Sequence, residues 1–536
     1  MSPARRQLVA HLLLLLAVSV AYEAAFVPYY LNVLDEGWPL YAAMRLHQGG
    51  VLYDDVFFVF PPGHLLVAWI AYALDPPGVV LSRILYAAFS VALCVAMYGL
   101  GRRLMPPRYA LAGALLLAVG ASREHLLQLL FGYRYLVIGV LALLAFARHL
   151  DRRDRRWLFA AGVLTGLLLV TRLTPAFAVG CAIGVGVLAA PNRWRDRLGD
   201  WAIYGAGVAI AAAPVVAWFA HSVGLEKMWL EAVYRPVAMT QLQSLPIPPW
   251  SWSPRSGARH HVRSWFVAVQ FRAWVLLYAG YAIGLGVVWL RARRDRRPFP
   301  DALLLTVVVW GAVYLLRSFG RSDGPHLYSA YPPVCLLLAH AASLLTRPAR
   351  VGAARPAMAA LGAILLGLWM WLNWSEQAFD PEVKGQYPLA VLDDRVKVRR
   401  DGGMPEFEKD LEVIQRVTRP GDTILDLSAS SMIYVLADRL GPGYADVVMP
   451  GTFLDEAEER AFVERLERDP PALVVFPAWD FDNRPDRAVR KSAPLLTRWV
   501  WERYQSYGNY REPKRRLRQR FVLMRPRAAP GASDAP

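Results

Sequence analysis

Apolar stretches close to the length of a bilayer crossing recur throughout residues 1–376 of this chain. A helix needs about 20 predominantly apolar residues to cross the hydrocarbon core of a membrane. Eleven stretches fit this pattern, at residues 7–27, 79–100, 108–122, 133–148, 157–172, 174–190, 203–222, 272–290, 302–317, 326–345 and 355–374. The sequence therefore predicts an α-helical polytopic membrane protein with about 11 transmembrane helices.

Two of these stretches need comment. Residues 7–27 are longer than the apolar part of a signal peptide and have no small-residue cleavage site, so we expect a retained span. Residues 157–190 allow two interpretations, because Thr174-Pro175 interrupts them. They form either two separate spans or one long element with a kink.

The distribution of charge divides the chain after Glu376. Residues 377–536 carry 26 basic and 26 acidic side chains, so the net charge of +17 belongs entirely to residues 1–376. Most basic residues of that part lie in alternate loops, as the positive-inside rule requires of cytoplasmic loops. We expect a multi-pass protein of the plasma (inner) membrane with a cytoplasmic N-terminus and an extracytoplasmic C-terminal part. Nucleic acid is not an expected partner, because the basic excess lies on the loops of a membrane protein.

The C-terminal part shows the alternation of short strands and helices that is typical of an α/β layer domain. Strands are predicted at 423–428, 446–450, 472–477 and 520–524, and helices at 432–440, 455–468 and 495–507. No glycine-rich turn follows the first strand, so we expect no nucleotide site there. The predicted organisation is a transmembrane domain (1–376), a soluble periplasmic α/β domain (377–527) and a disordered tail (528–536).

The loop at 28–78 is too long and too amphipathic for a simple connector. Two short helices on the membrane surface are expected in it, at 36–47 and 64–74. Asp35 and Glu36 lie where the first span meets the extracytoplasmic water. A carboxylate pair at a membrane boundary indicates a functional site. The alternative is that Asp35 caps a surface helix whose first turn contains Glu36.

A second polar cluster begins a later span. Arg317, Arg321, Asp323 and His326 fall within one short turn, and guanidinium groups suit a phosphate ligand. The alternative is a surface ion pair between Arg321 and Asp323 beside a snorkelling arginine. Further polar residues fall on the same predicted side of the membrane and suggest a water-filled cavity there, among them Arg134, Arg172, Asp54 and Asp55.

The string DEGWPLYAAMRLHQGGVLYDDVFFVFPPG, residues 35–63, resembles the first extracytoplasmic loop of the GT-C superfamily of polytopic membrane glycosyltransferases. It is most similar to the bacterial branch of aminoarabinose transferases and protein O-mannosyltransferases. RSDGPHL, residues 321–327, also resembles that superfamily, as does a soluble periplasmic domain after eleven to thirteen spans.

The resemblance implies a transferase. Such enzymes move a sugar from a polyprenyl-phosphate-linked donor to an extracytoplasmic acceptor, which is a lipid, a polysaccharide or a protein. An acidic residue of the first loop, Asp35 or Glu36, would be the general base. The residues implied to bind the donor phosphate or substrate are Arg321, His326, Asp323, Arg172, Arg134, Arg45, Tyr53, Asp54 and Asp55. The common phosphate-binding lysine of the family has no match here, and Arg45 is the nearest basic residue of the first loop.

No cofactor is predicted with certainty. The adjacent pair His260-His261 makes a divalent metal possible, but it has no spaced partner, and the three cysteines lie in apolar runs. A transporter or flippase for a lipid-linked or anionic solute is the main alternative function. A transporter would be expected to show paired repeats and ionisable residues near the midplane. The sequence shows neither, which favours the enzyme over the transporter, whereas a non-catalytic assembly partner with a degenerate site stays open.

Overall fold

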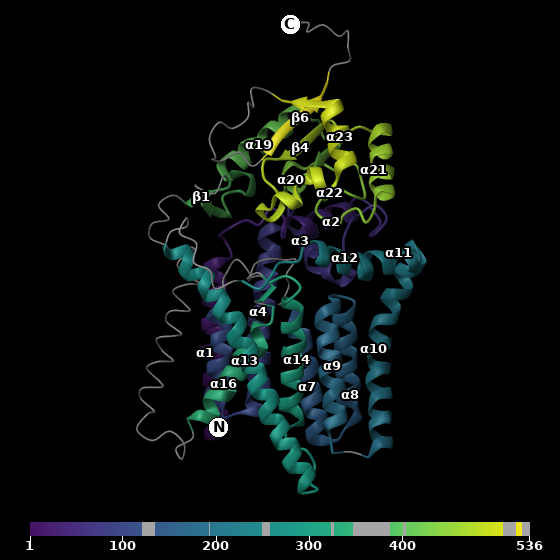
Figure 1. The fold of residues 1–536 in the computed structure, drawn as a ribbon. Coiled ribbons are helices and arrows are strands. Elements are labelled where there is room, and N and C mark those ends of the chain that lie inside the picture. The colour runs from purple at the N-terminus through teal and green to yellow at the C-terminus, as the bar shows by residue number, and fades with distance from the viewer. Residues whose placement is uncertain are drawn as a thin grey trace.

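The computed structural model describes residues 1–120, 135–191, 193–248, 258–322, 326–327, 329–346, 386–399, 404–507 and 521–527. Four helices in these ranges are long and apolar enough to cross a membrane: Pro3–Phe26, Val79–Leu104, Trp194–Val223 and Ala268–Arg294. The last belongs to α13 (Ala258–Arg294), and the others are α1, α4 and α10. They run side by side with shorter apolar helices and form one bundle (Figure 1).

The shorter helices of the bundle account for the remaining predicted stretches that lie in the described ranges. They are α5 (Pro107–Gly120), α7 (Leu136–Arg152), α8 (Arg155–Leu169), α9 (Leu173–Ala189), α14 (Ala302–Ser318) and α16 (Tyr331–Leu345). Residues 157–190 form two helices rather than one kinked element, because α8 ends before Val170 and Pro175 lies in the first turn of α9. The predicted span 355–374 and the predicted tail 528–536 lie outside the described residues.

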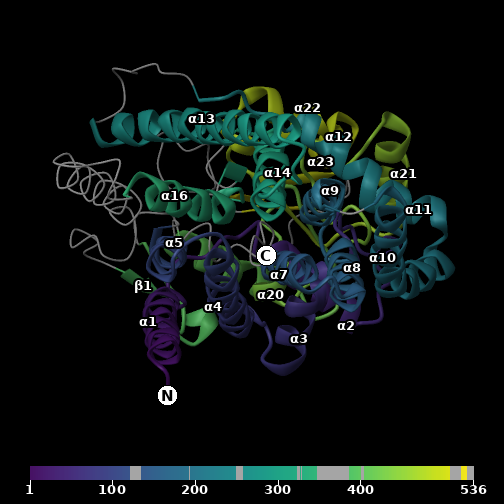
Figure 2. The same ribbon diagram turned by 90° about the horizontal axis from the view of Figure 1, so that it is seen from below.

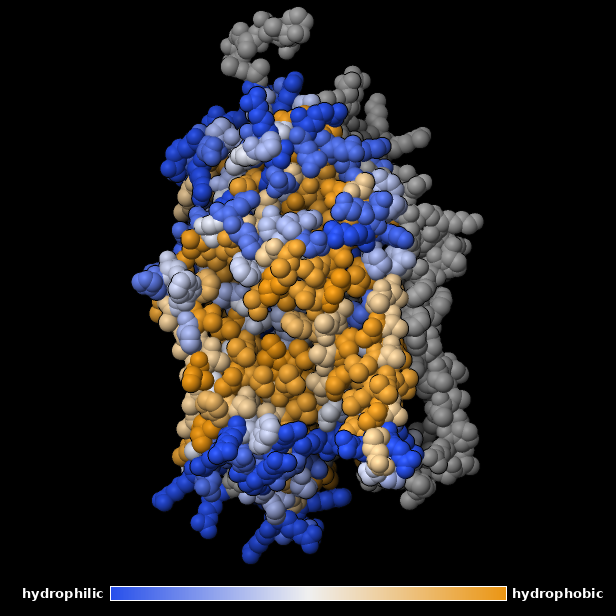
Figure 3. Space-filling view, turned by 180° about the vertical axis from the view of Figure 1, so that it is seen from behind, coloured by the Kyte–Doolittle hydropathy of each residue, from blue (hydrophilic) through white to orange (hydrophobic). Residues whose placement is uncertain are grey.

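The surface of the bundle is divided by polarity, as expected of a multi-pass membrane protein. A broad hydrophobic band covers its middle, and hydrophilic residues gather at both ends (Figure 3). Basic side chains occupy the last turns of α4 and α13, at the end that also carries the N-terminus (Figure 1). The C-terminal part, residues 386–399, 404–507 and 521–527, covers the opposite end and is called the soluble domain below because hydrophilic residues cover most of its surface (Figure 3). Seen from below, α13 lies along one side of the bundle and α1 and α4 along the other (Figure 2).

The soluble domain contains a small mixed sheet with the strand order β3-β4-β6-β5. β3 (Ile424–Asp426) and β4 (Leu473–Pro477) are parallel, whereas β6 (Phe521–Pro526) is antiparallel to both β4 and β5 (Tyr504–Ser506). The helices of the domain are α19 (Met404–Val417), α20 (Met432–Ala437), α21 (Glu456–Arg468), α22 (Val489–Ser492) and α23 (Pro494–Arg503). A separate hairpin pairs β1 (Gln386–Pro388) with β2 (Lys397–Arg399).

The predicted strand at 446–450 is wrong, because side chains hold this segment as a loop. The Asp446 carboxylate accepts a hydrogen bond of 2.8 Å from the Gly443 amide. The Thr452 hydroxyl donates to the carbonyl of Val447 and accepts from the amide of Met449. Local hydrogen bonds of this kind compete with sheet pairing. The predicted helix at 495–507 also ends early, at Arg503, where β5 begins.

The first loop forms the seam between the bundle and the soluble domain. It contains α2 (Gly37–His47), a 3-10 turn (Pro62–Leu65) and α3 (Leu66–Leu74), close to the two predicted helices. However, α2 does not lie on an open surface, because residues 37–44 are all buried. A Cβ atom at Gly37 would come within 2.3 Å of the Met432 amide nitrogen of α20, so only glycine permits this packing.

Candidate active site

The turn before α2 fixes the position of Asp35. The Asn32 side-chain oxygen accepts hydrogen bonds from the amides of Leu34 and Asp35, at 3.1 and 2.8 Å. The Asn32 amide group then donates to Oδ2 of Asp35 at 2.6 Å. This local network is an Asx turn, and it holds a carboxylate that is only 9% exposed. Neither carboxylate caps the helix, since Glu36 is the N-cap residue and makes no side-chain capping bond.

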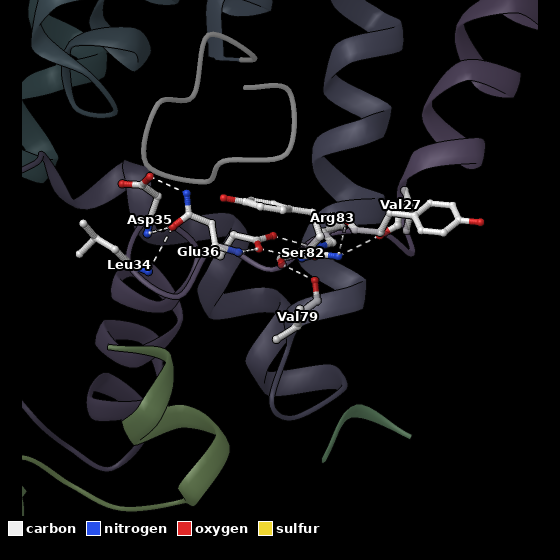
Figure 4. Close-up of polar contacts among 10 residues, drawn as sticks. Val27, Leu34, Asp35, Glu36, Val79, Ser82 and Arg83 are labelled. Atoms are coloured by element: carbon white, nitrogen blue, oxygen red, sulfur yellow. Dashed lines mark hydrogen bonds and ion pairs between the residues drawn. The ribbon is translucent and has the colours of Figure 1, made fainter. Parts of the chain in front are cut away.

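Glu36 points away from Asp35 and is bound by Arg83 of α4 (Figure 4). Arg83 Nε and Nη2 donate to the two carboxylate oxygens of Glu36, each at 2.7 Å. The same guanidinium donates to the carbonyls of Val27 and Tyr30, at 3.0 and 2.5 Å. Both side chains of the pair are buried. Glu36 therefore serves in a closed ion pair that ties the end of α1 to the start of α2.

Asp35 lines a cavity of about 780 Å³ at the junction of the bundle and the soluble domain. Basic side chains from two other parts of the bundle reach the same cavity: Arg172 precedes α9, whereas Arg317, Arg321 and His326 lie at and after the end of α14. The structure thus brings together a carboxylate of the first loop and basic groups that are far apart in sequence. Such a juxtaposition is typical of a site that combines a base with an anionic leaving group.

Arg172 has the most unusual environment of these cations. Its guanidinium carbon lies 3.9 Å from the centre of the Phe60 ring, and the residue is 6% exposed. Among the described residues, its Nη1 atom has no hydrogen-bond partner. The nearby Arg317 repels it electrostatically and makes a long hydrogen bond of 3.5 Å to Ser329. Two neighbouring guanidinium groups with unused donors are suited to bind an anion such as a phosphate.

Arg321 is bound differently. Its Nη2 donates to Oδ1 of Asp482 at 2.7 Å, and its Nη1 donates to the carbonyl of Gln243 at 3.2 Å. Asp482 belongs to the soluble domain and is also bound by Arg487. Arg321 therefore joins the bundle to the soluble domain at the wall of the cavity. His326 lies on the same wall, where its carbonyl accepts hydrogen bonds from Ser318 and Ser329.

The other predicted first-loop residues do not line this cavity. Arg45 donates to the carbonyls of Gly441 and Asp55, and Tyr53 donates to the carbonyl of Phe60. Asp54 pairs with Lys227, and Asp55 accepts from the amide of Val51. These contacts shape the loop and its junction with the soluble domain. Asp323 and Arg134 lie outside the described residues.

The soluble domain contributes a wall of the cavity that the sequence did not indicate. The turn Ser428-Ala429-Ser430 lines it, together with Trp479 and Asp482. Asp426 holds this turn by accepting hydrogen bonds from Ser428 and Ser430. Burial raises the pKa of the Asp426 carboxyl to about 6, although those hydrogen bonds oppose the shift. Of the missed residues, only Asn32 had a usable signal, since it lies three positions before Asp35, a spacing that suits an Asx turn.

The described residues hold no group of three or more His, Cys, Asp or Glu side chains that could bind a metal ion. The side chains of His260 and His261 lie outside the described set. In that set, the cavity is lined by one carboxylate of the first loop, one carboxylate of the soluble domain, and basic or neutral groups. The arrangement can supply a base and a binding site for an anion.

Comparison with known proteins shows which family and which solved structures this chain is similar to. The model of glycosyltransferase family 87 matches residues 58–322, a range that contains Arg172, Arg317 and Arg321. ArnT from Cupriavidus metallidurans in the apo state is similar over 98% of both chains, with a TM-score of 0.57 and 15% identity. The same protein bound to undecaprenyl phosphate gives a TM-score of 0.57 and 15% identity over 97% of this chain and 98% of ArnT.

A more distant likeness is to the archaeal oligosaccharyltransferase AglB from Archaeoglobus fulgidus, in complex with an inhibitory peptide and a dolichol-phosphate. It has a TM-score of 0.53 and 13% identity over 88% of this chain and 69% of AglB. No sequence among the curated proteins matches this chain. The resemblance seen in the first loop is confirmed: residues 58–322 match glycosyltransferase family 87, and the chain has the fold of the GT-C membrane glycosyltransferase ArnT.

Proposed function

We propose that this protein transfers a sugar from a polyprenyl-phosphate-linked donor to a hydroxyl group of an extracytoplasmic acceptor. The observation that carries the proposal is the shared cavity, which is lined by Asp35 on one side and by Arg172, Arg317 and His326 on others. The likeness to ArnT bound to undecaprenyl phosphate supports the choice of a polyprenyl-phosphate carrier.

Asp35 acts as the general base in this proposal. It removes the proton from the acceptor hydroxyl as the oxygen attacks the anomeric carbon of the sugar. The bond between that carbon and the phosphate oxygen breaks, and the polyprenyl phosphate leaves with the electron pair. A positioned base accelerates such a step by about 10²–10⁴-fold. Glu36 is a poor candidate for this role, because both of its carboxylate oxygens are engaged by Arg83.

Arg172 and Arg317 bind the phosphate of the donor. The charge on the phosphate oxygens grows as the bond to the sugar breaks, and buried cations stabilise that charge most strongly where water is excluded. The unused Nη1 donor of Arg172 supports this assignment. Arg321 contributes positive charge to the cavity but is held by Asp482, so its main role is to place the soluble domain over the site.

The bundle crosses the plasma membrane with the N-terminus in the cytoplasm and the soluble domain outside. The basic last turns of α4 and α13, at the end opposite the soluble domain, support this orientation. Alkaline phosphatase fused after residue 527 should be active in intact bacteria, and the same enzyme fused before residue 1 should be inactive. The reverse pattern would contradict the orientation.

The Asp35→Asn variant tests the chemistry. Purified protein in vesicles is given a synthetic polyprenyl-phosphate sugar with a radioactive hexose or pentose, together with an extract of cell envelopes as the acceptor source. We expect the transfer rate to fall by about 10²–10⁴-fold. Asp54→Asn is the matched control, because Asp54 is an exposed carboxylate of the same loop that does not line the cavity. Transfer by Asp35→Asn at the unmodified rate would refute the proposal, and movement of labelled lipid across the bilayer without transfer would favour a flippase.

A further inference from the structure

The short helical segment at residues 225–242 has two faces of different character. It consists of α11 (Leu225–Trp229), a π-helical turn (Leu230–Tyr234) and α12 (Arg235–Leu242). It crosses the end of α10, between the bundle and the soluble domain, at the periphery of the molecule (Figures 1 and 2). Gly224, with a φ of +87°, makes the sharp turn that separates the segment from α10.

The polar face of the segment, formed by Glu231 and Arg235, contacts the soluble domain. Arg235 is buried and donates to both carboxylate oxygens of Glu231, at 2.8 and 3.0 Å. It also donates to the Thr452 carbonyl at 2.7 Å and to the carboxylate of Glu458 at 2.9 Å. The Tyr444 hydroxyl donates to Glu231 at 2.5 Å. These bonds fasten the polar face to the soluble domain.

The opposite face is exposed and mainly apolar, although it also carries the exposed Glu226. On this face, Leu225, Trp229, Tyr234 and Val237 are between 55% and 63% exposed. The π-helical turn adds one residue to the repeat, which brings Tyr234 onto the side of the segment that carries Trp229. The preceding helix α10 also exposes large apolar side chains, with Ile210 at 62% and Trp218 at 69%, where it would contact lipid. Trp and Tyr beside a spanning helix are typical of the interface between headgroups and acyl chains.

The cavity lies against this segment. Val237, Thr240 and Gln241 of α12 line the cavity and are also exposed at the surface. Ala232 and Met239 line it as well but are buried. The segment therefore forms a wall of the cavity at the end of the bundle, at the level where a lipid headgroup would lie.

We propose that residues 225–242 are an interfacial helix seated in the headgroup region of the bilayer, and that the lipid-linked substrate reaches the cavity past α12. The partner of this face is the lipid bilayer, because the face follows directly on the lipid-facing helix α10 and carries Trp229 and Tyr234, the aromatic residue types of a membrane interface. The proposed position of residues 225–242 in the headgroup region rests only on their geometry and exposure. The access route rests on the proposed function.

Spin labels at engineered cysteines test the seating. Cysteines replace Leu225, Trp229 and Tyr234 singly in a Cys181→Ala background, since Cys94 and Cys335 are buried. Labels at Ile210 and Arg460 mark the bilayer core and bulk water, because both are exposed, one on α10 and one on α21 of the soluble domain. In vesicles of phosphatidylethanolamine and phosphatidylglycerol, we expect the three labels to collide with oxygen more than with nickel–EDDA. Nickel access equal to that at Arg460 would overturn the seating.

A Leu225→Glu/Trp229→Glu variant tests the route. Neither residue lines the cavity. We expect kcat/KM for a full-length polyprenyl donor in vesicles to fall about tenfold, since charged groups leave the interface. With a short-chain, water-soluble donor, the rate should stay within about twofold of the unmodified protein. Equal losses with both donors, or no loss with either, would overturn the route. The spin-label experiment does not depend on whether Asp35 is the base. The proposed position of residues 225–242 and the proposed function can therefore be refuted independently of each other.

Discussion

Arg83 binds both carboxylate oxygens of Glu36, each at 2.7 Å, and in doing so fixes the neighbouring Asp35 without touching it. The same guanidinium holds the carbonyls of Val27 and Tyr30, so the last turn of α1, the turn at Asn32 and the start of α2 are tied to α4. The two adjacent acids of the first loop thus have separate roles. Glu36 supports the loop, and Asp35 is presented to the cavity.

Arg83→Met should destabilise the protein. It leaves the Glu36 carboxylate buried without its partner, and breaking a buried ion pair costs about 3–5 kcal/mol. Thermal unfolding in detergent measures the loss. Arg103→Met is the matched control, because Arg103 lies in the last turn of the same helix and pairs with Asp151 at the exposed surface. That pair is worth no more than about 1 kcal/mol. Equal losses from the two variants would contradict the structural role of Arg83.

Changing Asn32 should alter the pH dependence of the reaction. Asn32→Asp keeps the oxygen that holds the turn but replaces the amide donor to Asp35 by a carboxylate. A like charge next to Asp35 raises the pKa of that carboxyl, so the pH at which activity rises should increase by about one unit. The pH profile of kcat/KM measures the shift. Glu36→Gln should not reproduce this change, and an unchanged profile for Asn32→Asp would argue against Asp35 as the base.

Substitutions of the arginines that line the cavity should lower the transfer rate to different extents. Arg172→Gln and Arg317→Gln should each lower kcat/KM for the donor by about 10²–10³-fold, because each removes a cation from the phosphate. Arg321→Gln should have the smaller effect on the rate. Since it releases Asp482, it should make the soluble domain more sensitive to limited proteolysis. A larger rate effect for Arg321 than for Arg172 would reverse the assignment of the phosphate ligands.

The soluble domain should lose stability as the pH rises through the weakly acidic range. Burial raises the pKa of Asp446 to about 6 from an ordinary value of 3.8. A carboxyl with a raised pKa favours the folded state when protonated, so its contribution is complete below pH 4 and lost as the pH passes 6. The change is about 3 kcal/mol for this one group. Thermal unfolding between pH 4 and 7 measures the slope.

Asp446→Asn should flatten that slope, because the amide cannot ionise. Asp469→Asn, at an exposed carboxyl of the same domain, serves as the control. If Asp446→Asn keeps the full pH dependence, another group is responsible. Asp426 would then be the first to examine, since burial also raises the pKa of its carboxyl to about 6.

Much of the bundle could be predicted from the sequence, because a bilayer imposes a minimum length on each apolar stretch. The pattern also indicated an acid of the first loop and basic groups near Arg172 and Arg321. It could not separate Asp35 from Glu36, since the deciding partner, Arg83, lies in a different helix. It also could not show that Arg45, Tyr53, Asp54 and Asp55 face away from the cavity, because this depends on how the loop folds on the soluble domain.

The soluble domain was harder to predict for a related reason. The segment 446–450 has the composition of a strand, but Asp446 and Thr452 hold it as a loop. The turn after β3 lacks the glycines of a nucleotide site and carried no other signal in the sequence, yet its residues Ser428, Ala429 and Ser430 line the cavity. Short polar motifs acquire such roles through contacts with residues that are far away in the sequence. Neither the hydrophobic periodicity nor the spacing of residues reveals those contacts.

The close packing of Gly37 on Met432 has a consequence for the time at which the protein becomes active. Asp35 is synthesised early and is inserted with the first span, whereas Ser428, Trp479 and Asp482 are among the last parts of the cavity to be translated. Until the soluble domain has folded onto α2, the cavity that Asp35 lines lacks one of its walls. The cavity is therefore complete only after the last of these segments has been translated and has folded against the first loop.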